Sequence, residues 1–157
     1  MGSERSGDRV LVIMAKAPRP GSVKTRLASG ISSDAVADFY RCLLEDTLVM
    51  VRSLNDVEVA IMCPESDVDD LAQFAGREVS VVAQRGTGLA AGLTSVFADF
   101  TKNARHAIAF NSDSPHLPPA VLERAFSVLD SRDVVIGPTH DGGYYLVGAK
   151  ASHPTLF

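Results

Sequence analysis

The sequence predicts a three-layer α/β/α sandwich, in which helices cover both faces of a mostly parallel β-sheet. Short apolar runs alternate along the chain with segments of helical spacing, the pattern of repeated strand–helix–strand units. The run at residues 10–15 (VLVIMA) is apolar throughout, as expected of a central strand buried on both faces. The last two apolar runs are joined by only a short turn, which predicts a late antiparallel pair of strands.

The individual elements follow from local signals. Pro64 ends one apolar run, and Ser32 and Ser33 offer N-caps for a helix. In chain order we expect a strand at 10–15, a loop at 17–27, a helix ending near Ser53, a strand at 57–63, a short helix from Ser66 and a strand at 79–83. A turn at 84–88, a helix to about Thr101, a strand at 107–110, a helix from Pro118, and strands at 134–139 and 144–149 follow.

The length of 157 residues and the hydrophobic content of 46% fit one domain with a substantial core. We expect a disordered arm at residues 1–8 and a single domain at 9–157. The chain stops after HPTLF without a closing element. Either this short tail packs back onto the sheet, or the domain is truncated and lacks its usual C-terminal part.

The balance of charge excludes one class of partner. The chain has 19 Asp and Glu against 15 Lys and Arg, which argues against nucleic acid binding. No apolar run approaches membrane-spanning length and no signal peptide precedes the first strand, so we expect a cytoplasmic protein with no membrane partner. Cys42 and Cys63 are both expected in the core as free thiols.

Three cations gather in the loop after the first strand, although the chain is acidic overall. We predict that Lys24 and Arg26, together with Arg19, bind di- or triphosphate oxygens. Gly21 belongs to the same predicted site because it lets the backbone approach a ligand closely. The loop lacks the glycines of a Walker motif, and a solvated basic loop is the alternative.

A second candidate site lies at the end of the strand at 107–110, where the sequence turns polar at Asn111. Asp113 falls just beyond the carboxyl end of this strand, where open α/β sheets bind their ligands. Its carboxylate suits a Mg²⁺ or Mn²⁺ ion that bridges phosphates, and Ser112 is a candidate for positioning the substrate. The alternative is an Asp that only caps the next helix.

A third candidate site is the turn that contains Asp141, past the end of a later strand. Asp141 is predicted to act with Asp113 as a catalytic acid and metal ligand. Its neighbours His140, Gly142, Gly143 and Tyr144 are candidate substrate-positioning residues. Asp-Gly is also a strong hairpin signal, so we expect Asp141 to make the turn as well.

Three motifs, MAKAPRPGSVKTRLA, FNSDSPHLPP and IGPTHDGGYYLVGAK, together resemble the bacterial selenodomain-associated transferase family. That family is assigned the GT-A fold of nucleotide-diphospho-sugar transferases. A more distant likeness runs to the phospholactate guanylyltransferases and the molybdenum-cofactor nucleotidyltransferases. The resemblance implies that Lys24 and Arg26 contact nucleotide phosphates, that Asp113 binds the metal and that Asp141 lies near the metal or the acceptor. The chain departs from the family at residues 87–93 (TGLAAGL), which lack the usual acid and arginine.

Together these features predict a metal-dependent, glycosyltransferase-like enzyme. Its donor would be a nucleoside diphosphate-sugar and its acceptor an unknown small molecule. The alternative within the same fold is a guanylyltransferase-like nucleotidyltransferase that uses a nucleoside triphosphate and releases pyrophosphate. A non-catalytic nucleotide-binding module is the alternative of another class, and assembly into a homo-oligomer is left open.

Overall fold

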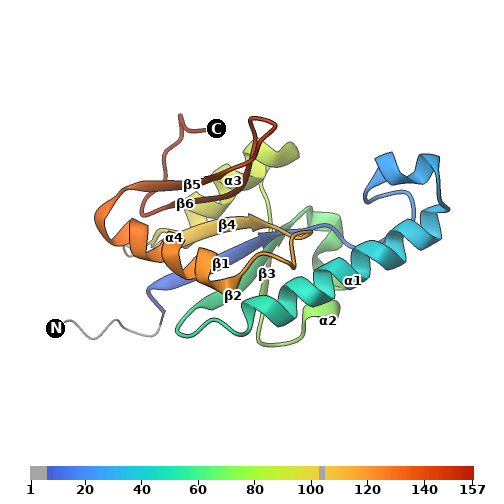
Figure 1. The fold of residues 1–157 in the computed structure, drawn as a ribbon, viewed down its shortest axis with the longest axis horizontal. Coiled ribbons are helices and arrows are strands. Elements are labelled where there is room, and N and C mark those ends of the chain that lie inside the picture. Colours follow the sequence, from blue (N-terminus) through green and yellow to red (C-terminus); the bar gives the residue numbers. More distant parts are fainter. Residues whose placement is uncertain (1–6, 103–104) are drawn as a thin grey trace.

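Six strands form one sheet in the order β3-β2-β1-β4-β6-β5, in a computed structural model that describes residues 7–102 and 105–157 (Figure 1). The strands are β1 (Arg9–Met14), β2 (Glu58–Cys63), β3 (Ser80–Ala83), β4 (His106–Asn111), β5 (Val134–Pro138) and β6 (Tyr144–Ala149). Strands β1 to β4 pair in parallel, whereas β6 is antiparallel to both β4 and β5. The predicted mostly parallel sheet with late antiparallel strands is confirmed.

Four α-helices in the described part of the chain cover the sheet, as the alternating pattern predicts. They are α1 (Ser33–Val51), α2 (Val68–Ala75), α3 (Gly88–Phe100) and α4 (Pro119–Ser131), and the short 3₁₀ helices η1 (Thr25–Ser29) and η2 (Glu65–Asp67) lie beside them. Ser32 caps α1, because its hydroxyl accepts a hydrogen bond from Ala35 N at 3.2 Å. The loop expected at 17–27 ends in η1, which begins at Thr25 and precedes α1.

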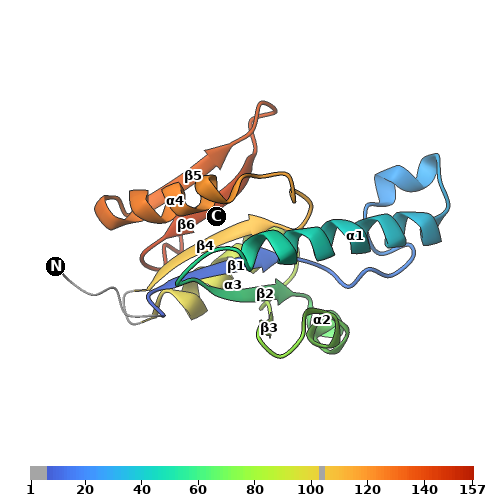
Figure 2. The same cartoon turned by 60° about the horizontal axis from the view of Figure 1, so that its bottom comes forward.

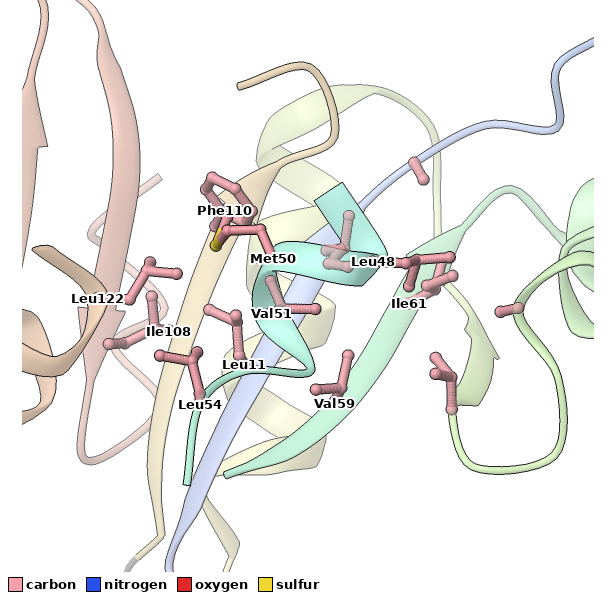
Figure 3. Packing of buried hydrophobic residues seen from close by; sticks show 14 of the residues in the cluster. Leu11, Leu48, Met50, Val51, Leu54, Val59, Ile61, Ile108, Phe110 and Leu122 are labelled. Carbon is pink, nitrogen blue, oxygen red and sulfur yellow. The ribbon is translucent and has the colours of Figure 1, made fainter. Parts of the chain in front are cut away.

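The side chains of β1 alternate between two cores. Leu11 and Ile13 point into a cluster with the buried faces of α1, α2 and α4, whereas Val10 and Val12 point into a cluster with α3. In the first cluster, the end of α1 lies over β1, β2 and β4 (Figure 3). Three helices thus cover one face and α3 covers the other, which gives the predicted three layers (Figure 2).

Both ends of the described chain contact the rest of the fold. Residues 1–6 of the expected arm at 1–8 lie outside the described residues, while Gly7 O and Asp8 O accept hydrogen bonds from Arg105 Nε (2.5 Å) and His106 N (2.8 Å). At the other end, the ring of Phe157 stacks on Phe97 of α3 with 5.7 Å between centroids. The segment that ends in Phe157 therefore packs back onto the α3 side of the sheet.

The two cysteines occupy different environments. Cys63 is buried as expected, and burial raises the pKa of its thiol to about 11. The expectation that Cys42 lies in the core is wrong, because α1 buries the face that carries Tyr40, Leu44 and Leu48 and leaves Cys42 exposed. No helix in the described part of the chain is both long and apolar enough to cross a membrane.

Candidate functional site

A cavity of about 1140 Å³ opens at the carboxyl ends of the parallel strands. Its walls come from the loop after β1, from α1, from the loop between β3 and α3, and from the residues that follow β4. This is the edge of an α/β sheet at which ligands are expected to bind. The volume is ample for a nucleotide-sized molecule.

Lys24 and Asp113 meet in this cavity. Lys24 Nζ donates to Asp113 Oδ2 in an ion pair that joins the loop after β1 to the residues that follow β4, although the two residues are 89 positions apart. The side chains remain 34% and 27% exposed, so a ligand in the cavity can reach both. Lys24 also adopts a left-handed backbone conformation (φ 47°, ψ 41°), which is uncommon for a residue other than glycine. Arg26 lines the same cavity.

A buried tyrosine holds the two halves of the site together. Tyr40 of α1 accepts a hydrogen bond from Lys16 N (3.2 Å) and shares one with Ser112 Oγ (2.8 Å). Thr47 Oγ1, two turns further along α1, donates to Leu43 O at 2.7 Å and lies within 3.3 Å of Ser112 O. Burial raises the pKa of Tyr40, so its phenol stays neutral at ordinary pH. Tyr40 therefore links α1 to the residue before Asp113, and the Ser112 hydroxyl is engaged in the hydrogen bond with Tyr40.

The structure places Arg19 in a cluster with two carboxylates. Its guanidinium pairs with Asp67 (Nη1–Oδ1 2.6 Å) and Asp70 (Nη2–Oδ2 2.6 Å) and also donates to Ser66 O. Neither Arg19 nor Gly21 is among the residues that line the cavity. Arg19 thus ties the loop after β1 to the segment after β2.

Asp67 is a buried residue that the sequence analysis missed. It accepts hydrogen bonds from Ala17 N (2.9 Å), from Ser66 Oγ (3.0 Å) and from Arg19. Burial opposes ionisation, but these donors outweigh it and hold the pKa of Asp67 below its ordinary value. The acidic segment after Pro64, set against a basic loop in the same chain, was the signal that could have identified this pair.

The loop between β3 and α3 forms another wall of the cavity, and it was predicted only as a turn. Gln84 Nε2 donates to Gly86 O (3.0 Å) and Gly88 O (3.3 Å), which closes the loop on itself. Gly86 and Gly88 both have positive φ, 76° and 85°, a conformation that other residues rarely adopt. The closely spaced glycines after a strand were the available signal for this wall.

The turn that contains Asp141 does not reach the cavity. Between β5 and β6 this turn projects away from the neighbouring strand ends (Figures 1 and 2). Asp141 Oδ1 accepts hydrogen bonds from Thr139 Oγ1 and from Gly143 N, and these bonds lower the pKa of the carboxyl group. The five residues of this predicted site are absent from the cavity lining: His140, Asp141, Gly142, Gly143 and Tyr144.

The residues after β4 fit a divalent cation in part. Asp113 is the one carboxylate among the described residues that line the cavity. Asn111, the last residue of β4, lines the cavity too, and its Oδ1 is buried without a hydrogen-bond partner in the described part of the chain. Within that same part of the chain, no three His, Cys, Asp or Glu side chains are grouped closely enough to hold a metal ion by themselves. Mg²⁺ is commonly held by one or two carboxylates together with substrate phosphates and water, which this donor set allows.

Comparison with known families identifies the chain. A family described as uncharacterized protein conserved in bacteria (DUF2064) matches residues 47–157, which include β4, Asp113 and the β5–β6 turn. The chain belongs to this family. No curated protein sequence matches it. The finer resemblance to selenodomain-associated transferases and to guanylyltransferases stays a prediction.

Solved structures share the fold of this DUF2064 chain. A protein from Desulfovibrio desulfuricans G20, proposed to be a nucleotide-diphospho-sugar transferase, has a TM-score of 0.83 at 27% identity and matches 91% of this chain. A 4-diphosphocytidyl-2C-methyl-D-erythritol synthase from Anaerococcus prevotii has a TM-score of 0.61 at 12% identity, over 92% of this chain and 71% of its own. Rv0371c from Mycobacterium tuberculosis, in complex with manganese, has a TM-score of 0.57 at 20% identity, over 90% of this chain and 70% of its own.

These similarities confirm the GT-A-like fold class. The chain spans 63% of the length of the Desulfovibrio protein, which is less than two thirds. The structural neighbours are therefore evidence for the fold and for a transferase-like architecture, and the activity itself is a matter for proposal.

Proposed function

We propose that this protein is a metal-assisted transferase that binds a nucleoside diphosphate-sugar in the cavity and passes the sugar to a small-molecule acceptor. The observation that carries the proposal is the meeting of Lys24 and Asp113 at the carboxyl edge of the sheet. A cation and a carboxylate in one cavity are the groups that a metal–diphosphate ligand requires. The Desulfovibrio neighbour supports this substrate class.

Each residue has a distinct role in this proposal. Lys24 and Arg26 would bind oxygens of the diphosphate, Lys24 as a point charge and Arg26 as a two-pronged donor. Asp113, with Asn111 Oδ1, would hold Mg²⁺ or Mn²⁺, which when bound neutralises charge on the departing diphosphate. Ser112 would position the backbone of Asp113 through Tyr40. Arg19 would hold the loop in shape through Asp67.

Nucleotidyl transfer is the second candidate function. Two structural neighbours are a 4-diphosphocytidyl-2C-methyl-D-erythritol synthase and a cytidylyltransferase from Leptospira borgpetersenii. In that reaction an acceptor oxygen attacks the α-phosphorus of a nucleoside triphosphate and pyrophosphate leaves. The same cations and the same carboxylate would serve, because both reactions release a charged diphosphate group.

Ligand-dependent melting tests the proposal. A panel of nucleoside diphosphates, triphosphates and nucleotide-sugars, each with and without Mn²⁺, should contain a ligand that raises the melting temperature only in the presence of metal. Asp113→Asn should abolish this shift. Asp133→Asn removes the partner of Lys150 (3.5 Å) outside the cavity lining and should preserve the shift.

Product analysis then separates the two reactions. Release of a nucleoside diphosphate supports glycosyl transfer, and release of pyrophosphate supports nucleotidyl transfer. A metal-dependent shift without turnover of any donor would favour the non-catalytic binding module. Absence of a shift with every ligand would contradict nucleotide binding altogether.

A further inference from the structure

Two of the charged side chains that line the cavity form an ion pair with each other. Lys16, Lys24, Arg26 and Asp113 are the charged residues among the described residues that line it. Asp113, the carboxylate proposed to hold the metal, is already paired with Lys24, which is proposed to hold phosphate. A ligand that uses either group must first separate the pair.

We propose that the site accepts a metal-complexed diphosphate as one unit and discriminates against the free cation and the free diphosphate. This inference rests on the proposed function, since it assigns the form in which the ligand binds. The Lys24–Asp113 pair is the device that makes the distinction. It closes when the site is empty and is exchanged for two new pairs when the complex binds.

The argument follows from charge. A free divalent cation at Asp113 displaces the Lys24 ammonium and leaves that ammonium beside a second positive charge. A free diphosphate at Lys24 releases the Asp113 carboxylate beside a second negative charge. The complex supplies an opposite charge to both residues at once, so that one ion pair is replaced by two.

The surroundings make this exchange effective. Both side chains are about one-third exposed or less, so their attraction is screened less than that of a surface pair. Asp113 directly follows Ser112, whose hydroxyl is hydrogen-bonded to the buried Tyr40 of α1. The same ion pair therefore couples the two binding events, and linkage requires that coupling to be reciprocal.

Mn²⁺ binding in the absence of nucleotide is the first test. Calorimetry on the whole chain should show that Lys24→Met binds Mn²⁺ at least about fivefold more tightly than the wild type, the lower end of usual couplings between sites. The gain should vanish in the double variant Lys24→Met/Asp113→Asn. Lys150→Met breaks the Lys150–Asp133 ion pair, outside the cavity lining, and should leave Mn²⁺ affinity unchanged.

The second test uses UDP as the diphosphate probe. Asp113→Asn should bind metal-free UDP more tightly than the wild type, because Lys24 is then unpaired, and should lose the enhancement by Mn²⁺. In the wild type, Mn²⁺ and UDP should each raise the affinity for the other by the same factor, after correction for their complex in solution.

The outcomes distinguish this inference from the proposed function. Unchanged or weaker Mn²⁺ binding by Lys24→Met overturns the ion-pair exchange, whatever the nucleotide results. If Lys24→Met does not fold, Lys24→Gln removes the same charge and is judged by the same criterion. Failure of UDP and of every other nucleoside diphosphate in the melting panel to bind any variant contradicts the proposed function, while the Mn²⁺ measurements still decide the exchange. Independent binding of Mn²⁺ and UDP to the wild type overturns the coupling alone.

Discussion

Side-chain contacts hold the loop after β1, and Asp67 accepts two of the hydrogen bonds that this loop donates. It lies beneath the loop, buried, and satisfies Ala17 N and Arg19 at the same time. Replacement of one carboxylate oxygen by an amide nitrogen would leave either Ala17 N or Arg19 without its acceptor. Lys24 belongs to the same loop as Ala17 and Arg19, so Asp67 anchors the loop that carries it.

Asp67→Asn should lower the free energy of unfolding by about 1–3 kcal/mol, the usual cost of a buried unsatisfied group. The folded state lowers the pKa of Asp67, so its stabilisation is complete above the ordinary carboxyl pKa and is lost as the pH falls through the lower folded value. Urea unfolding from pH 3 to 7 should therefore show a shallower pH dependence in Asp67→Asn. Asp69→Asn, at an exposed position nearby, is the control, and equal slopes in all three proteins would contradict the assignment.

Asp141 presents the opposite situation. Its carboxylate is predicted to act in the site, but in the structure it accepts hydrogen bonds within its own turn. Asp141→Asn should change the affinity for Mn²⁺ and nucleotide by less than about twofold, the range of surface substitutions away from a site. The reason is that its carboxylate accepts hydrogen bonds from Thr139 Oγ1 and Gly143 N, and that Asp141 is not among the residues that line the cavity. A calorimetric titration checks this. A large loss of affinity would show that the turn closes onto the bound ligand.

Among the secondary-structure elements, β6 joins the edge strand β5 to the parallel part of the sheet. This strand inserts between β4 and β5 and pairs antiparallel with each. Gly148 lies where the three strands meet, and a Cβ atom there would lie 2.8 Å from Val135 Cγ1 and 2.9 Å from Ile108 Cγ1. The close approach of the strands leaves no room for a side chain.

Gly148→Ala should therefore lower the free energy of unfolding by about 1–3 kcal/mol, the typical cost of an overpacked core. Chemical denaturation followed by circular dichroism measures the change. Gly30→Ala is the matched control, because a Cβ atom at Gly30 meets nothing within 4 Å. Wild-type stability of Gly148→Ala would show that β6 can shift away from its neighbours.

The helix α1 has two functions within the fold. Its apolar face covers β1, β2 and β4, and its polar side chains Tyr40 and Thr47 reach the backbone around the cavity. The apolar spacing predicted the first function. The second could not be inferred, because a Tyr and a Thr on a buried helix face have many other ways to satisfy their hydroxyl groups.

For the whole molecule, the two faces of the sheet are covered unequally. Three helices pack on one face, whereas α3 alone, joined by Phe157, packs on the other. Phe157 stacks on Phe97 and so extends the cover of the second cluster. The stability of this face depends on contacts from the last described residue.

Phe157→Ala should lower the free energy of unfolding by about 1–2 kcal/mol, the value of an aromatic pair with some loss of buried area. Equilibrium urea unfolding provides the measurement. Leu156→Ala, at a side chain that is 38% exposed, should have a smaller effect. Equal effects of the two substitutions would show that the stack with Phe97 adds nothing.

The sequence by itself determined the class of fold and most of its elements, because apolar spacing and caps act over a few residues. It also predicted Lys24, Arg26 and Asp113 as site residues, since charged residues at strand ends are local signals, and all three line one cavity. Only the tertiary structure decided that Lys24 and Asp113 pair across 89 residues, that Arg19 turns to Asp67, and that the Asp141 turn lies apart. These outcomes depend on strand order and on the direction of each loop, which arise from packing among distant segments and leave no pattern in neighbouring residues.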